Sequence, residues 1–465
     1  MTTIAIEFND AGLGAVGPDG LLGSGARPEP GYAVITGSSS AFGTEAWHQA
    51  RLRPRHIHNR YWRELSDEPL RMTAGPYAAS ADLVSAHLRS LWRGWSTGVS
   101  GTLFVIPAYW SQEQLGLLLG IAEELAIPVI GLVDSAVASI RCRYEVDDLL
   151  VIDASLHDIT VTRMKQDGET AIDTRQSIDS LGVERLQRAC VEHIAACFLE
   201  RTRFDPLHDA TSEQALYDGL GEWLPALQRS TVVTATLDWG GEEYSVPVER
   251  DHLAAALAIY CEPLMQHIRS RLVAGHRVAI QLADRVAVFP GIVAAIERLP
   301  QVVTFVLEPA AAARGALGRA DQFVKANGGI PLKISLRWDR AAVSVATVHH
   351  ASLPGTAVPT HVLHAARAYR IGSEPLSIGS ELAPGEYGIG LPAGNPGVSR
   401  RHCSIQKGPN GVELTDHSRF GTRLNGHEID KAAVLQVGDV ISIGEPPVEM
   451  SVLAEVTVQD SNDGT

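Results

Sequence analysis

The segments GVSRRHCSI (residues 397–405) and DHSRFGTRLNG (residues 416–426) decide the fold of the C-terminal part of this 465-residue chain. Serine, arginine, histidine and glycine fill both segments, and short apolar runs separated by turns flank them. Several short strands with regular turn signals are typical of an all-β sandwich or barrel. We therefore predict an all-β domain over residues 360–455.

The two segments resemble the signature of the forkhead-associated (FHA) family, S-x-x-H followed about twenty residues later by S-x-N-G-T and N-G. In addition, LSIGS at residues 376–380 is similar to the family's I-G-R strand end, and LQVGDVISIG at 435–444 is similar to its L-x-x-G-D-x-I-x-I-G. The resemblance implies a β-sandwich that binds a phosphothreonine-containing protein through loops at one end.

By this resemblance, Ser399 should donate its hydroxyl to the phosphate, and His402 should brace the loop from inside. The neighbouring loop should be held by Gly421, Thr422 and Asn425. The predicted phosphopeptide-binding residues are Ser399, Arg400, Arg401, Arg419, Gly421, Thr422 and Asn425.

The segment departs from the family pattern at two positions, because the family's arginine is replaced by Ser380 and its asparagine by Phe420. Loss of a hydrogen bond to a charged group removes about 1.5–3 kcal/mol. The three arginines of the loops are candidates for the missing positive charge. The alternative is that they are solvated and that the domain binds an unphosphorylated partner.

The first 350 residues alternate strand-like and helix-like segments, which predicts an α/β architecture. Ser111 and Gln114 form a capping box at the start of one helix. The predicted strands cover residues 3–8, 31–36, 102–107, 128–132, 149–152 and 277–282. The predicted helices cover residues 182–204, 250–272 and 289–299, and residues 47–95 are predicted to form helices with turns.

Four segments of this region together resemble the nucleotide-binding domain of DnaK-type heat-shock chaperones, which belongs to the actin-like ATPase group. They are residues 102–139, the turn VIDASLHDITV (151–161), AIQLADRVAVFPGI (279–292) and EPAAAARGALGRA (308–320). The resemblance implies a ribonuclease-H-like fold with two lobes, the first over about 1–165 and the second over about 166–350.

The turns that grip phosphate in that family are altered here. The first turn reads IEFNDAG at residues 6–12, where the family has glycine and threonines, and the second, DASLHD at 153–158, has no glycine and is two residues shorter. The first lysine of the chain is Lys165, so the first lobe lacks the family's catalytic ammonium group. The predicted vestigial cleft comprises Glu7, Asn9, Asp10, Asp134, Asp153, Asp158, Asp284 and Gly315.

An acidic side chain where a phosphate should bind is repulsive in a cleft of low dielectric constant. We therefore predict a pseudo-ATPase with no catalytic residue and no cofactor. The alternative is a weak site for Mg-ATP in which Asp153 holds a magnesium-bound water.

Composition limits the other interpretations. The net charge of -15 argues against general nucleic-acid binding, and no apolar run is long enough to predict a membrane span. Five scattered cysteines and the absence of a secretory leader favour the cytoplasm, and the bias toward arginine favours a bacterial source. No ligand spacing predicts a metal site. Residues 351–359 are a predicted linker and residues 456–465 a predicted disordered tail.

Together these expectations describe a non-catalytic, chaperone-like scaffold that recruits protein partners through its FHA domain. The partner is expected to be a phosphothreonine protein or a DnaK-type chaperone. Two alternatives from other classes stay open: a slow, nucleotide-switched ATPase that controls the FHA domain, and a polymer-forming actin-like protein.

Overall fold

The computed structural model of the protein comprises two compact units, Met1–Ala346 and Thr347–Thr465. It describes residues 2–23, 28–37, 39–273, 275–323, 329–343, 359–365, 367–372, 374–383, 386–391, 394–408, 411–424, 427–435, 439–445 and 447–453. The predicted linker up to residue 358, the predicted tail and the candidate Asn425 lie outside these ranges. Among the described residues, no helix has the length and apolar character needed to cross a membrane.

The first sheet of unit one has the strand order β18-β10-β9-β1-β2-β3. Its central strand β1 is antiparallel to β2 on one side and parallel to β9 on the other, and β10 continues the parallel set. The bounds are β1 (Thr2–Glu7), β2 (Gly14–Gly17), β3 (Gly20–Leu22), β9 (Val99–Ile106), β10 (Val129–Asp134) and β18 (Leu332–Lys333).

The second sheet, β17-β16-β11-β12-β13-β19, repeats this arrangement. Its central strand β11 is antiparallel to β12 and parallel to β16, which is followed by the parallel β17. The bounds are β11 (Asp148–Ala154), β12 (Asp158–Gln166), β13 (Thr170–Asp179), β16 (Val278–Leu282), β17 (Val302–Val306) and β19 (Ser335–Leu336). The sequence placed the lobe boundary at 165/166, whereas β11 and nearly all of β12 precede that boundary and already belong to the second sheet.

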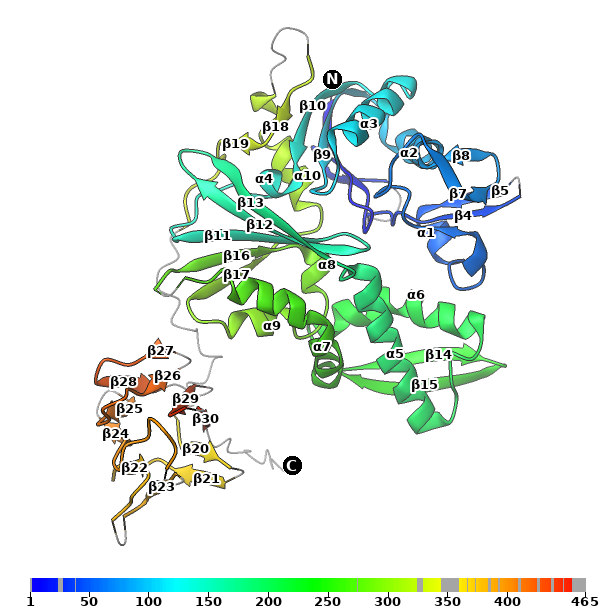
Figure 1. Ribbon diagram of the computed structural model, residues 1–465. Coiled ribbons are helices and arrows are strands. Elements are labelled where there is room, and N and C mark those ends of the chain that lie inside the picture. The colour runs from blue at the N-terminus through cyan, green and yellow to red at the C-terminus, as the bar shows by residue number, and fades with distance from the viewer. Residues whose placement is uncertain are drawn as a thin grey trace, which may run out of the picture. The chain divides into compact units, whose positions relative to one another are not determined.

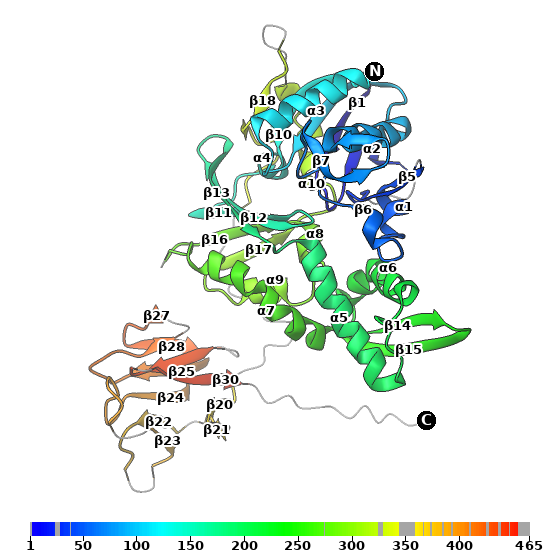
Figure 2. The same cartoon turned by 45° about the vertical axis from the view of Figure 1, so that its right-hand side comes forward.

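Helices cover these sheets. The capping box predicted at Ser111 is confirmed, because the Ser111 hydroxyl accepts a hydrogen bond from the Gln114 N–H. The helices α5, α6 and α7 gather with the hairpin β14–β15 beyond the second sheet (Figures 1 and 2). The bounds are α1 (Gly43–Trp47), α2 (Ser80–Trp95), α3 (Gln112–Glu124), α4 (Ser135–Ser139), α5 (Val183–Thr202), α6 (Ala210–Leu227), α7 (Arg250–Arg269), α8 (Asp284–Ala287), α9 (Ile292–Glu297) and α10 (Ala311–Leu317), with β14 (Val232–Trp239) and β15 (Glu242–Glu249).

The region 47–95 differs from its prediction, because three short strands and a 3₁₀ helix precede its long helix α2. The strand β6 pairs with β4, and β7 pairs with β8. β6 takes its partner from outside the local sequence, whereas β7 and β8 form a local hairpin, and neither pairing shows as helical periodicity. The bounds are β4 (Ala33–Thr36), β5 (Ser39–Phe42), β6 (Ile57–His58), β7 (Pro69–Ala74) and β8 (Tyr77–Ala79), with short 3₁₀ helices at Pro54–His56 and Ala320–Gln322.

Unit two is built from two antiparallel-rich sheets, β21-β20-β30-β29-β26-β27 and β23-β22-β24-β25-β28. Both sheets contribute to one core, which includes Val362, Ile378, Ile405, Leu414 and Ile441. The bounds are β20 (His361–His364), β21 (Arg367–Arg370), β22 (Leu376–Gly379), β23 (Gly388–Gly390), β24 (Cys403–Gly408), β25 (Gly411–Asp416), β26 (Arg423–Leu424), β27 (His427–Glu428), β28 (Ala432–Leu435), β29 (Val440–Ile443) and β30 (Val448–Leu453).

Candidate functional site

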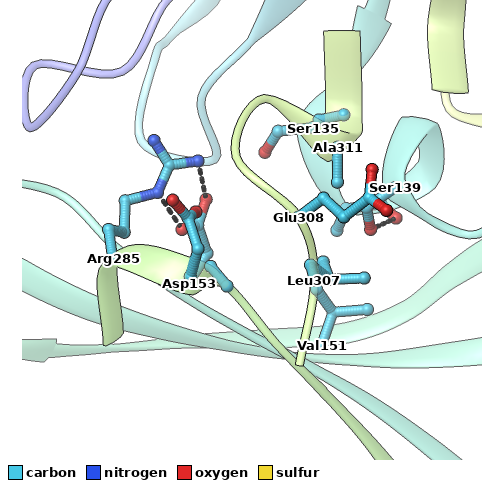
Figure 3. Close-up of a pocket in the computed structure, with 12 residues that line it drawn as sticks. Ser135, Ser139, Val151, Asp153, Arg285, Leu307, Glu308 and Ala311 are labelled. Atoms are coloured by element: carbon cyan, nitrogen blue, oxygen red, sulfur yellow. Dashed lines mark hydrogen bonds and ion pairs between the residues drawn. The ribbon is translucent and has the colours of Figure 1, made fainter. Parts of the chain in front are cut away.

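An arginine that the sequence analysis did not select occupies the cleft of unit one. Arg285 lies on α8, directly after β16, and its Nε donates to Asp153 Oδ1 at 2.8 Å. Its terminal nitrogen binds the carboxylate of Glu7, which is 3% exposed at the end of β1. Figure 3 shows the guanidinium facing Asp153. Because Glu7 belongs to the first sheet and Asp153 to the second, Arg285 joins the two sheets.

Burial and charge oppose each other in this cluster. Burial raises the pKa of Glu7, and the guanidinium of Arg285 opposes that rise. Burial alone would lower the pKa of Arg285, but attraction by Asp153 and Glu7 outweighs it and raises this pKa. Burial also raises the pKa of the neighbouring Asp284. The one guanidinium is already neutralised, so the cleft offers no free positive charge from Arg285 to a triphosphate.

The two turns that the resemblance assigns to phosphate binding are hydrogen-bonded to each other. Asn9 donates from Nδ2 to the carbonyl oxygen of Ala154 at 3.0 Å, and Asp10 Oδ1 accepts from the Leu156 N–H at 2.8 Å. In an anion-binding turn, such backbone groups would point at the phosphate. Here the side chains of Asn9 and Asp10 in the first turn form hydrogen bonds with backbone groups of the second turn.

Three other predicted cleft residues have structural contacts. Asp134 caps α4 by accepting from the Ala136 N–H at 2.9 Å, and its carboxylate also binds Arg175 at 2.7 Å. Asp158, at the end of the second turn, forms an ion pair with Arg63. Gly315 lets α10 approach α4, because a Cβ at this position would overlap the carbonyl oxygen of Ala138.

The remaining space in the cleft is small. The cavity drawn in Figure 3, beside Asp153, has a volume of about 20 Å³. A second cavity, on the side of Glu7 and Gly12, has about 140 Å³. Asp284 and Arg285 line both cavities, whereas small-molecule sites typically enclose ~300–1,000 Å³. Each of these two cavities is therefore smaller than a typical small-molecule site.

In unit two, His402 joins the two polar loops quoted first. Its Nδ1 accepts a hydrogen bond from the Ser399 N–H at 3.0 Å, so that nitrogen carries no proton. The other nitrogen, Nε2, then donates to the carbonyl oxygen of Gly421 at 3.2 Å. Burial lowers the pKa of His402, which favours this neutral form. The bracing role predicted for His402 agrees with these contacts.

Ser399 lies on the first of these loops and is half-buried. Its hydroxyl accepts a hydrogen bond from the Arg419 N–H at 3.3 Å and donates its own proton to no described residue. The neighbouring loop is fixed by Thr422, whose hydroxyl binds Asp416 at 2.8 Å, and by the Gly421 N–H, which donates to Ser418 Oγ at 2.8 Å. A fixed hydroxyl with a free proton can donate to an anion.

The loop arginines divide into two kinds. Arg400 lies 3.3 Å from Glu381, and Arg401 lies 2.8 Å from Glu386. Hydrogen bonds from the Ser377 hydroxyl, from a backbone N–H and from Arg401 lower the pKa of Glu386 to about 2. The exposed guanidinium of Arg419 makes no ion pair with any described residue. Arg419 is therefore the loop arginine best able to meet a phosphate.

The two departures from the family pattern lie at this same end of the domain. Ser380 donates its backbone N–H to the carbonyl oxygen of Ser399 at 3.2 Å, so residue 380 borders the serine that should bind phosphate. Phe420 follows Arg419 and is 68% exposed. The site therefore combines an intact serine and histidine with an apolar side chain.

Comparison with known families identifies residues 370–444 as an FHA domain. An FHA domain implies phosphothreonine-dependent protein–protein interaction, and the match includes the six described residues of the predicted binding set. No curated protein matches the chain. The heat-shock-chaperone resemblance of the first 350 residues and the DnaK-type partner remain predictions.

Proposed function

We propose that this chain is a non-catalytic scaffold that recruits threonine-phosphorylated proteins through its FHA domain. The observation that carries the proposal is the Ser399–His402–Gly421 network within the FHA match. It presents a hydroxyl donor on a braced loop, and on the next loop lies the guanidinium of Arg419, which forms no ion pair with any described residue. Charge-assisted hydrogen bonds from such groups suit a phosphate dianion.

Unit one is, in this proposal, a degenerate actin-like body that supports the FHA domain. The repeated strand order of its two sheets supports a two-lobed, ribonuclease-H-like architecture. The contacts of Arg285 with Glu7 and Asp153 support loss of the nucleotide, because protein groups fill the place where phosphates would lie.

A second candidate function is the slow, nucleotide-switched ATPase. The retained Asp153 and the duplicated sheets favour it, whereas the small cavities beside Arg285 oppose it. Calorimetric titration of the full chain with Mg-ATP separates the two candidates. The scaffold predicts that Asp153→Ala leaves the titration with Mg-ATP unchanged, because no nucleotide binds beside Asp153. Micromolar affinity that Asp153→Ala abolishes would establish the switch instead.

The partner-binding part is tested by pulling down a degenerate phosphothreonine peptide library with the full chain. Enriched peptides should be lost by Ser399→Ala and kept by the matched control Ser442→Ala, a change on β29 outside the two polar loops. Equal recovery of phosphorylated and unphosphorylated peptides by the native chain would refute phosphate-dependent recruitment.

A further inference from the structure

The largest of the cavities described here adjoins the second turn of the cleft at Leu156, His157 and Asp158. It has a volume of about 400 Å³ and is bordered by Arg60 and Arg63 of the first lobe and by Arg185 and Arg188 at the start of α5. This volume lies within the ~300–1,000 Å³ typical of small-molecule sites. It shares no lining residue with the cavity beside Asp153 and Arg285. We call it the arginine pocket.

Two pairs of oppositely charged side chains in the arginine pocket neutralise each other. Arg63 forms an ion pair with Asp158. Glu184 lies 3.4 Å from His157 Nδ1, and the hydrogen bond from His157 lowers the pKa of Glu184. Burial alone would lower the pKa of His157, but the contacts with Glu184 and with the carbonyl oxygen of Asn59 outweigh burial and raise this pKa, which favours the charged pair.

Three guanidinium groups remain. Arg60 lies 3.8 Å from the exposed Glu64, which does not line the pocket. Arg185 stacks over the ring of Tyr260 at 4.9 Å, a contact that leaves its charge uncompensated. Neither Arg185 nor Arg188 forms an ion pair with a described residue. Against these three cations the pocket lining adds one further carboxylate, that of Asp179, so the open space carries excess positive charge.

Guanidinium groups bind phosphate oxygens in a planar, bidentate geometry and are weakly hydrated compared with an ammonium. Two lobes supply the three groups, so an anion with several oxygens can bridge them. We propose that the arginine pocket binds a small molecule carrying two or more linked phosphates. This site is independent of partner recruitment by the FHA domain.

The test is calorimetric titration of the full chain with inorganic pyrophosphate at constant ionic strength. The native chain should bind pyrophosphate at submillimolar concentration, and Arg60→Gln/Arg188→Gln should weaken binding about tenfold or more, because two charge-assisted contacts are removed. The matched control, Arg89→Gln/Arg269→Gln, removes one exposed arginine from each lobe outside the pocket and should bind as the native chain does.

Further arms establish what is recognised. ADP should bind comparably and adenosine should not, and citrate, a carboxylate trianion, should bind at least about tenfold more weakly than pyrophosphate. Arg185→Gln gives a second variant if the double change lowers the melting temperature. The proposal is overturned if the native chain shows no binding of millimolar pyrophosphate, if the pocket variants bind as the control does, or if citrate competes equally.

Discussion

Introducing an arginine at Ser380 should strengthen phosphopeptide binding. The backbone N–H of Ser380 contacts the carbonyl oxygen of Ser399 at 3.2 Å, so a side chain at 380 starts beside the predicted phosphate donor. Arg400 and Arg401 are already paired with Glu381 and Glu386, which limits repulsion of a new guanidinium. One hydrogen bond to a charged group contributes about 1.5–3 kcal/mol, which corresponds to about 10- to 150-fold in affinity.

The assay is fluorescence anisotropy with a labelled phosphothreonine peptide selected by the native chain and with its unphosphorylated counterpart. Ser380→Arg should tighten only the phosphorylated peptide. Val434→Arg adds the same charge on β28, where the native side chain is 57% exposed, and should change neither affinity appreciably. The reasoning fails if both arginine variants behave alike, or if Ser380→Arg tightens the two peptides equally.

Three further perturbations test the remaining contacts. Arg285→Met leaves Glu7 buried without its partner and should lower the free energy of unfolding by about 3–5 kcal/mol at pH 7.5. Urea denaturation should show a smaller loss of stability in the double variant Glu7→Gln/Arg285→Met. Equal losses in the single and double variants would contradict the ion pair. Burial raises the pKa of Asp10 from 3.8 to about 6, so the folded chain binds this proton more tightly and stability falls as pH rises from about 4 to 6. Asp10→Asn should therefore stabilise the chain by up to about 3 kcal/mol at pH 7 and change little at pH 4, whereas an equal effect at both pH values in denaturation curves would exclude this origin. Phe420→Asn restores the family residue at an exposed position, so the free energy of unfolding should change by less than about 0.5 kcal/mol. Fluorescence anisotropy should show two- to tenfold tighter phosphopeptide binding, the contribution of roughly one neutral hydrogen bond. Weaker binding would mean that the phenyl ring contacts the partner.

Local signals in the sequence predicted much of this structure. The capping box at Ser111 works because both partners lie within four residues of each other. The FHA segments were recognisable because serine, histidine and glycine stand at fixed spacings in loops. In contrast, the boundary between the two lobes depends on which strand pairs with which, and β12 joins the second sheet through contacts that periodicity does not encode.

The contents of the cleft were predicted only in part. The acidic residues Glu7, Asp153 and Asp284 were predicted to line the cleft, but the arginine beside them was not, although a cation adjacent to Asp284 in the altered turn was a usable signal. Asp134 was expected in the cleft, and in the structure it caps α4 and binds Arg175, a residue 41 positions away. Such pairings arise from tertiary packing, and a short-range pattern cannot distinguish a capping carboxylate from a catalytic one.

The claim that Ser399 binds the phosphate of a phosphothreonine partner is tested most directly by one ratio. This ratio compares the affinities of the full chain for phosphorylated and unphosphorylated forms of a selected peptide, before and after Ser399→Ala. We expect a ratio of at least about ten in the native chain that falls toward one in the variant. A native ratio of one, or a ratio that Ser399→Ala leaves unchanged, would contradict the account.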